Sequence, residues 1–136
     1  MPQMIFVNLP VKDLDKSMAF FKALGFSFNP QFTDETAACM VISDTIFAML
    51  LTHAKFKDFT PKAIADATQT SEVLIALSRE NREAVDTIVS DAVAAGGSTY
   101  NKPQDHGFMY GHGFQDLDGH IWEVMWMDPA AVQQQG

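Results

Sequence analysis

The apolar positions of this chain alternate in some segments and recur at helical spacing in others, and the two patterns follow the same order twice. Residues 4–10 (MIFVNLP) are rich in β-forming side chains and stop at a proline, which predicts a strand. Asp13 and Gly25 are the candidate N-cap and C-terminal stop of a helix between them. A short strand near 26–30 and strands near 36–43 and 45–53 are then expected.

Residues 54–71 carry a proline, mixed charge and small polar side chains, which predict a linker with a short helical piece. The first pattern then returns. The expected elements are a strand over 71–78, a helix capped by Asn81 and ended by Gly96 and Gly97, a short strand near 98–101, and strands over 108–115 and 120–127 around a turn at 116–119.

The spacing of equivalent positions supports an internal repeat of about 68 residues. Phe6 precedes the cap Asp13 by seven residues, and Leu74 precedes the cap Asn81 by seven. The repeat predicts an α+β fold of two tandem βαβββ modules, about 3–53 and 72–127, in a single domain of residues 1–136. The alternative is a ferredoxin-like α+β domain, which has a second helix late in each unit.

Charge and composition narrow the classes of partner. The net charge of −8 argues against nucleic acid as a partner, because such binding depends on Lys and Arg. No apolar run reaches the roughly 20 residues that span a membrane, and the first residues do not resemble a signal peptide. The single cysteine, Cys39, lies in an apolar run, so we expect a buried, inert thiol and a cytoplasmic protein without an intrachain disulfide.

Two segments resemble the vicinal oxygen chelate superfamily, which includes glyoxalases, bleomycin resistance proteins and extradiol dioxygenases. FVNLPVKDLDKSMAFFKALGF resembles the opening of the family's first module, and GFQDLDGHIWEV resembles its last hairpin, with Leu117 in place of the usual turn proline. The resemblance implies that mixed sheets form an open cup around a small-molecule site, and that the protein is a homodimer. Phe56, Phe59 and Ile64 in the linker are apolar residues that could cover a partner.

The family's metalloenzymes place four metal ligands in the cup, and the resemblance puts these positions at Phe6, Met49, Leu74 and Glu123. Phe and Leu have no donor atom, and Met offers only a soft thioether. Three of the four expected ligands are therefore lost, so no metal site and no other cofactor is predicted, although a divalent metal is the family's usual one.

Strand alternation predicts which residues line the cup. If Phe6 faces it, so do Asn8, Leu74 and Glu123, while the residues between them face the helices. A carboxylate among apolar side chains is costly without a partner. A two-residue loop at 117–118 would place His112 opposite Glu123, and a bulged loop would shift that register by one.

The remaining candidates on this hairpin have more than one interpretation. Tyr110 is expected in the pocket beside His112 if the two-residue loop forms. His120 has the opposite parity from Glu123, and His106 lies before the strand, so a three-histidine metal site is not expected. Glu123 itself is either a pocket acid or a rim carboxylate in water.

Two functions follow from this pattern. The first is a metal-independent protein that binds a small molecule, for which the acidic composition suits a cationic ligand. The second is a glyoxalase-like lyase or isomerase, or a dioxygenase-like enzyme, with an altered centre that uses Glu123 and His112 as catalytic residues.

Overall fold

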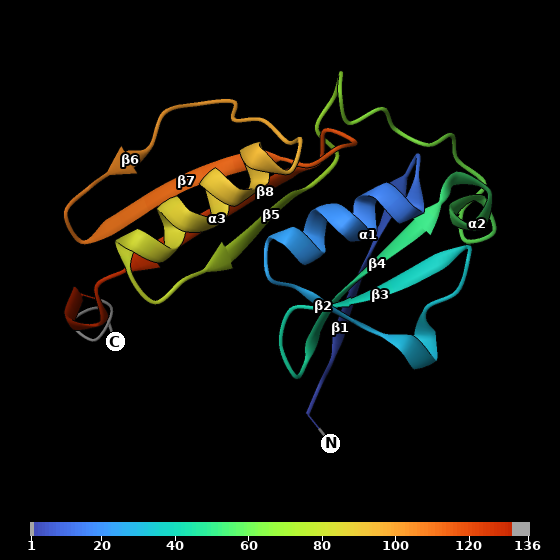
Figure 1. The fold of residues 1–136 in the computed structure, drawn as a ribbon, viewed down its shortest axis with the longest axis horizontal. Helices are drawn as coiled ribbons and strands as arrows, with labels where there is room; N and C mark the ends of the chain where they lie inside the picture. The colour runs from blue at the N-terminus through green and yellow to red at the C-terminus, as the bar shows by residue number, and fades with distance from the viewer. Residues whose placement is uncertain (1, 132–136) are drawn as a thin grey trace. The chain divides into compact units, whose positions relative to one another are not determined.

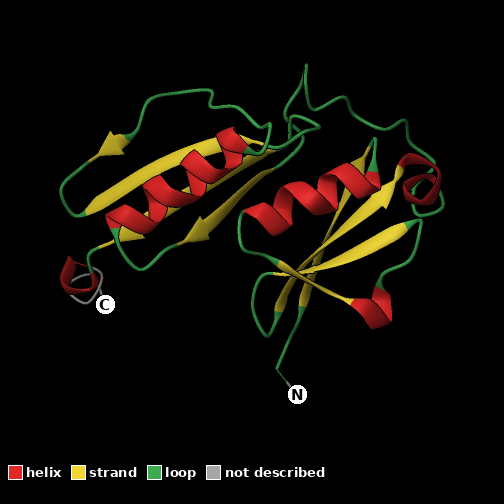
Figure 2. Cartoon of the chain, in the orientation of Figure 1, coloured by secondary structure: helices red, strands yellow, loops and turns green. Residues whose placement is uncertain are grey.

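The computed structural model describes residues 2–131, which form two compact units with their boundary between Asp66 and Ala67. This boundary lies inside the linker expected at 54–71. Figure 1 labels the elements, and Figure 2 separates helices from strands by colour. The first unit contains β1 (Ile5–Val11), α1 (Leu14–Ala23), β2 (Ser27–Asn29), the 3-10 turn η1 (Pro30–Phe32), β3 (Ala37–Val41), β4 (Ile46–Thr52) and α2 (His53–Lys57). The second contains β5 (Leu74–Ser78), α3 (Arg82–Ala94), β6 (Gln104–Asp105), β7 (Met109–Gln115) and β8 (Ile121–Met127).

Each unit is one four-stranded, unclosed, mixed sheet with a helix packed on it. The strand orders are β1-β4-β3-β2 and β5-β8-β7-β6, and the first two strands of each order are parallel. The α+β class and the two tandem βαβββ modules are therefore confirmed. The two separate four-stranded sheets do not match the ferredoxin-like alternative.

The predicted caps set the ends of both long helices. The Asp13 carboxylate accepts from Lys16 N, and the Asn81 side chain accepts from Ala84 N, which satisfies a backbone donor of each first turn. Gly25 and Gly96 follow the helices with φ of 100° and 110°, a left-handed conformation in which a glycine ends a helix without strain.

The core of each unit lies between its helix and one face of its sheet. In the first unit Phe20 and Phe21 of α1 are buried and meet edge to face at 5.0 Å. In the second, Phe114 and Trp122 are fully buried and stack at 6.4 Å beneath α3. Cys39 is a buried free thiol, as expected, and burial raises its pKa.

One predicted strand is misplaced. The short strand expected near 98–101 is reduced to a single bridge between Ser98 and Gln115, and β6 forms only at Gln104–Asp105. The chain leaves the sheet between these two points, and Pro103, which has no N–H with which to continue a ladder, directly precedes β6. No helix within residues 2–131 combines the length and the apolar character needed to cross a membrane.

Candidate functional site

The second unit carries an open cavity of about 190 Å³ on the sheet face that α3 leaves uncovered. Its floor is formed by β7 and β8, and its wall by residues 99–107, which we call the strap. The side chains that line it are Tyr100, Lys102, Gln104, His106, Met109, Glu123 and Met125, with the glycines Gly111 and Gly113 between them.

Glu123 lies at the centre of the floor with small residues on both sides. Its strand partners are Ala76 on β5 and Gly113 on β7, and the side chain is partly exposed. Paired residues in a sheet point to the same face, so a methyl group and a hydrogen atom are its nearest neighbours across the strands. The strand neighbours of Glu123 therefore leave room beside the carboxylate for other groups.

Tyr100 reaches over the empty position at Gly113. A Cβ atom built on Gly113 would lie 2.8 Å from Tyr100 Cζ and closer still to the phenolic oxygen, so only glycine leaves room for this ring. Partial burial raises the pKa of Tyr100, and the nearby charge of Glu123 raises it further. The phenol therefore stays protonated at neutral pH and can donate a hydrogen bond to a ligand.

The β7–β8 turn sets the register that places Glu123 opposite Gly113. The buried Asp116 carboxylate accepts from Asp118 N, His120 N and Trp122 Nε1 at 2.9, 3.0 and 3.0 Å. These bonds hold a connection from Asp116 to His120 that is longer than a two-residue loop. The pKa of Asp116 is raised by burial, and the charge of His120 and these hydrogen bonds oppose that rise.

His112 does not face Glu123. The register is the shifted one, in which His112 pairs with Val124, so its side chain starts from the other face of the sheet. Its Nε2 donates to Asn101 O at 3.0 Å, which fastens the start of the strap to β7. His112 borders the pocket through this contact. Of the two registers left open by the sequence, the bulged one forms, and His112 therefore does not lie opposite Glu123.

Tyr110 also belongs to the opposite face, so the place in the pocket expected for it with a two-residue loop is wrong. Tyr110 pairs with Trp126, and its hydroxyl donates to Asp86 on α3 at 2.6 Å. The error has the same cause as for His112, because a shift of one residue moves every side chain of a strand to the other face.

The other predicted pocket residues have the expected parity within their own sheets. In the first sheet Asn8 pairs with Met49, and Phe6 lies two residues before Asn8, so all three share a face. In the second, Leu74 is two residues before Ala76, the partner of Glu123. Phe6 and Leu74 are about half exposed within the described chain.

The four positions at which the resemblance implies metal ligands do not suit a divalent metal. Phe6 and Leu74 have no donor atom, Met49 has a thioether, and only Glu123 has a hard oxygen donor. The described residues also contain no group of three or more His, Cys, Asp and Glu side chains that could hold a metal ion.

The three histidines of the last hairpin are dispersed. His106 and His112 border the pocket, but His120 is buried near Glu72, with 3.5 Å between His120 Nδ1 and Glu72 Oε1. His53, outside this hairpin, is exposed at the start of α2.

Sequence reasoning missed Tyr100 and the strap. The only local signal was the pair of glycines in the segment YGHGF, which leaves two successive positions on one face of the strand without a side chain. An aromatic ring from elsewhere in the chain can fill this space, but the sequence does not show which ring does so.

Comparison with known proteins places these features in a family. The model of the bleomycin resistance protein-like N-terminal family matches residues 3–43. No curated protein matches the chain. Among solved structures, the hypothetical protein SA1046 from S. aureus is 34% identical over 93% of this chain and 95% of its own, with a TM-score of 0.78.

Two more distant structures share the fold. A glyoxalase/bleomycin resistance protein/dioxygenase family enzyme from Burkholderia phytofirmans PsJN is 16% identical, covers 93% of this chain and 99% of its own, and has a TM-score of 0.76. The fosfomycin resistance protein FosX from Listeria monocytogenes is 20% identical, covers 93% and 91%, and has a TM-score of 0.65. With its two βαβββ modules and these matches, the chain belongs to the vicinal oxygen chelate superfamily, in the group of glyoxalase and bleomycin resistance-like proteins.

Proposed function

We propose that this protein binds a small organic molecule in the pocket of the second unit, without the divalent metal of the family's metalloenzymes. The observation that carries the proposal is Glu123, a partly exposed carboxylate that faces a cavity between Ala76 and Gly113. The cavity brings several polar side chains together with the apolar side chains of Met109 and Met125, and convergent polar groups beside apolar surface are typical of small-molecule sites.

The lining limits the chemistry of the ligand. Glu123 accepts a hydrogen bond from a basic nitrogen or a hydroxyl group, and Tyr100 donates one to an acceptor. Met109 and Met125 offer flexible, polarisable walls to an apolar body. Lys102 in the strap also lines the cavity and offers a donor to an acceptor group of the ligand.

The test uses three probes of one shape and different charge: benzylamine, benzyl alcohol and benzoate. Titration is followed by the amide NMR signals of Gly113 and Glu123. We expect benzylamine to bind most tightly and benzoate least, because a cation gains from an uncompensated carboxylate close by. Bleomycin without metal, suggested by the family description, is a fourth probe.

Glu123→Gln keeps the shape of the side chain and removes its charge. We expect it to weaken benzylamine binding by about five- to tenfold, which corresponds to one charge-assisted hydrogen bond, and to leave benzyl alcohol within about twofold. The matched control is Glu35→Gln, an exposed residue of the first unit with the same change of charge. Equal binding of all three probes, or an unaltered benzylamine affinity in Glu123→Gln, would contradict the proposal.

The alternative function is an enzyme, a glyoxalase-like lyase or isomerase or a dioxygenase-like protein with an altered centre. In this geometry its acid and base would be Tyr100 and Glu123, with His112 acting only through the strap. Elemental analysis of purified protein separates the two functions. One divalent ion per chain, lost in Glu123→Gln and kept in Glu35→Gln, would favour the enzyme.

The other expected properties belong to the same proposal. Pocket roles for Phe6, Asn8, Met49 and Leu74, a cytoplasmic location, a homodimeric state and the absence of nucleic acid as a partner stay predictions. Sedimentation that shows only monomer at micromolar concentration would contradict the dimer.

A further inference from the structure

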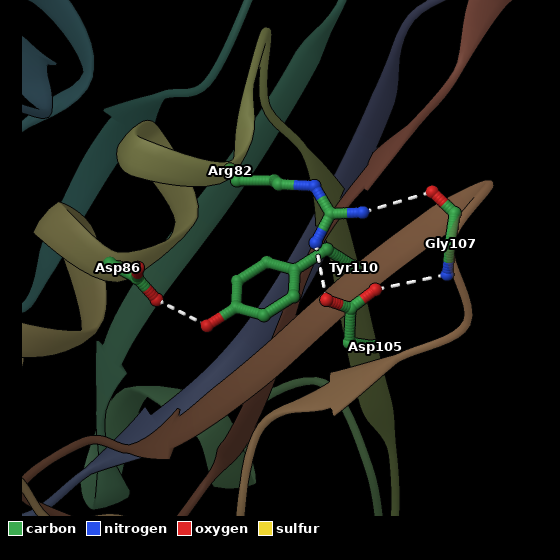
Figure 3. A network of polar contacts seen from close by, with 5 residues as sticks. All are labelled: Arg82, Asp86, Asp105, Gly107 and Tyr110. Atoms are coloured by element: carbon green, nitrogen blue, oxygen red, sulfur yellow. Dashed lines mark hydrogen bonds and ion pairs between the residues drawn. The ribbon is translucent and has the colours of Figure 1, made fainter.

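The second unit contains a polar network on the sheet face opposite the pocket, and it ends on the strap. Figure 3 shows Arg82 at its centre, between Tyr110 and Asp105. The Arg82 guanidinium donates from Nη1 to Asp105 Oδ2 and from Nη2 to Gly107 O, at 2.5 and 2.9 Å. The same guanidinium lies over the rings of Tyr110 and Trp126, 5.3 and 5.1 Å from their centroids.

The strap reaches both faces of the sheet because its residues alternate. Asp105 pairs with Tyr110 and therefore points to the α3 side, whereas Gln104 pairs with Gly111 and points to the pocket. His106 follows Asp105 and lines the pocket as well. Because Asp105 lies between Gln104 and His106 in the chain, holding Asp105 in place on one face also holds these two residues in place on the other.

Few other hydrogen bonds hold the strap near Asp105. β6 is only two residues long and lies at the edge of the sheet, where a short strand has little stability of its own. His106 N donates to Met109 O at 2.8 Å, and Gly107 N donates to Asp105 Oδ1 at 2.9 Å. Arg82, which comes from α3, holds this end of the strap in place by donating to both the Asp105 carboxylate and the Gly107 carbonyl.

We propose that Arg82 is a positioning residue for the pocket: its forked hydrogen bonds to Asp105 and Gly107 hold Gln104 and His106 in the pocket wall. The role in ligand binding rests on the function proposed above. Arg82 and Asp105 are both partly exposed, so their ion pair adds little to global stability. The Arg82–Asp105 ion pair instead orders the strap locally.

The choice of arginine follows from this geometry. A guanidinium is a planar fork that binds two acceptors and stacks on aromatic rings at the same time, whereas a lysine ammonium is a single point charge. Arg82→Lys should therefore keep the charge and lose most of the positioning.

The first measurement needs no ligand. Hydrogen exchange of the His106 and Gly107 amides is followed by NMR in the full chain. We expect exchange about tenfold faster in Arg82→Gln and in Asp105→Asn, which is the loss of roughly one hydrogen bond's protection. Asp86→Asn is the matched control, because Asp86 belongs to the same network but binds only Tyr110. Lys16→Gln, on the exposed side of α1, controls for the lost positive charge.

Acidification gives an independent readout. The hydrogen bond from Arg82 lowers the pKa of Asp105, as does the bond from Gly107 N. The interaction between Arg82 and the Asp105 carboxylate is therefore fully formed above the ordinary aspartate pKa. It is lost as the pH falls through the lowered pKa of Asp105. In Arg82→Gln the Asp105 carboxyl should titrate at a higher pH than in the wild type, as measured by ¹³C NMR.

The second measurement is benzylamine affinity. Arg82→Gln should weaken it by about threefold, while Asp86→Asn and Lys16→Gln leave it unchanged. Unaltered exchange of His106 and Gly107 in Arg82→Gln would overturn the positioning role, whatever happens to binding. Faster exchange with unaltered benzylamine affinity would overturn its part in the pocket. Failure of wild-type protein to bind benzylamine would instead contradict the proposed function, while the exchange result still decides whether Arg82 holds the strap.

Discussion

The two sheets have the same pairing pattern and differ in the side chains at equivalent places. Three residues lie side by side at the centre of each sheet: Asn8, Met49 and Cys39 in the first, and Ala76, Glu123 and Gly113 in the second. The first set consists of larger side chains, and the second places a carboxylate beside two small residues. This difference in side-chain size contributes to the pocket on the second sheet.

The pairing of the connection between helix and third strand separates the two units at a second point. In the first, β2 runs along β3 for three residues, whereas in the second only Ser98 forms the equivalent bridge before the strap begins. Helix α3 has 13 residues and α1 has 10, so the repeat is not constant in length. The connection in the second unit leaves the sheet after Ser98 and carries Tyr100 over Gly113. A pocket thus arises where a gap in one strand coincides with a stretch of chain that has left the sheet.

The two hairpin turns offer the strongest test of this comparison. Asp116→Ala removes the acceptor of three N–H groups in the second turn, and the donor on Trp122 is buried. We expect a loss of about 3–4 kcal/mol in the free energy of unfolding, because buried donors without partners are costly.

Ser43 of the first turn is the matched control. Its hydroxyl accepts from Thr45 N and Ile46 N at 3.3 and 3.2 Å in an exposed setting. Ser43→Ala should cost only about 0.5 kcal/mol. Urea unfolding followed by tryptophan fluorescence, which reports on the second unit, and by circular dichroism measures both. Similar losses in the two variants would show that the buried turn has no special role.

The glycines of β7 test the gap itself. Gly113→Ala should cost about 1–2 kcal/mol and displace Tyr100, because the new methyl would overlap the phenol. Gly111 lies two residues earlier on the same face, and a Cβ there would meet only Val124 O at 3.5 Å. Gly111→Ala should therefore be neutral or slightly stabilising. Urea unfolding and the NMR signals of Tyr100 distinguish the two variants. Equal effects of Gly113→Ala and Gly111→Ala would contradict the position of the Tyr100 ring over Gly113.

The fold was predictable because its signals are local. Asp13 and Asn81 precede their helices directly, the glycines follow them, and alternation marks the strands. Each signal acts over a few residues, and the repeat allowed one module to support the other. The expected parities of Glu123 and Leu74 followed from the same alternation.

The site was predictable only in part because it depends on long-range geometry. The register of His112 depends on how many N–H groups the Asp116 side chain gathers in the turn, which spacing alone does not reveal. Tyr100 owes its place to the absence of a side chain at Gly113, thirteen residues later. Arg82 and Asp105 meet across 23 residues through an ion pair that no motif marks.

The two tyrosines of the chain provide the smallest and most selective test, since each reports on one face of the second sheet. The pKa of Tyr110 is raised first by its hydrogen bond to Asp86, and that of Tyr100 first by burial and then by the charge of Glu123. A raised phenol pKa means that the folded state favours the neutral form. The unfolding free energy should therefore fall as the pH rises from the ordinary tyrosine pKa of about 10 through the raised values.

Ultraviolet titration of phenolate formation resolves the two groups by substitution. Asp86→Ala should lower the pKa of Tyr110 and leave Tyr100 unchanged, because the hydrogen bond that favours the neutral phenol is removed. Glu123→Gln should lower the pKa of Tyr100 by a smaller amount, because burial, the larger cause, persists in this variant. A response of Tyr110 to Glu123→Gln would mean that both rings lie on the same face as Glu123, and the assignment of Tyr100 to the pocket and Tyr110 to the helix side would then be wrong.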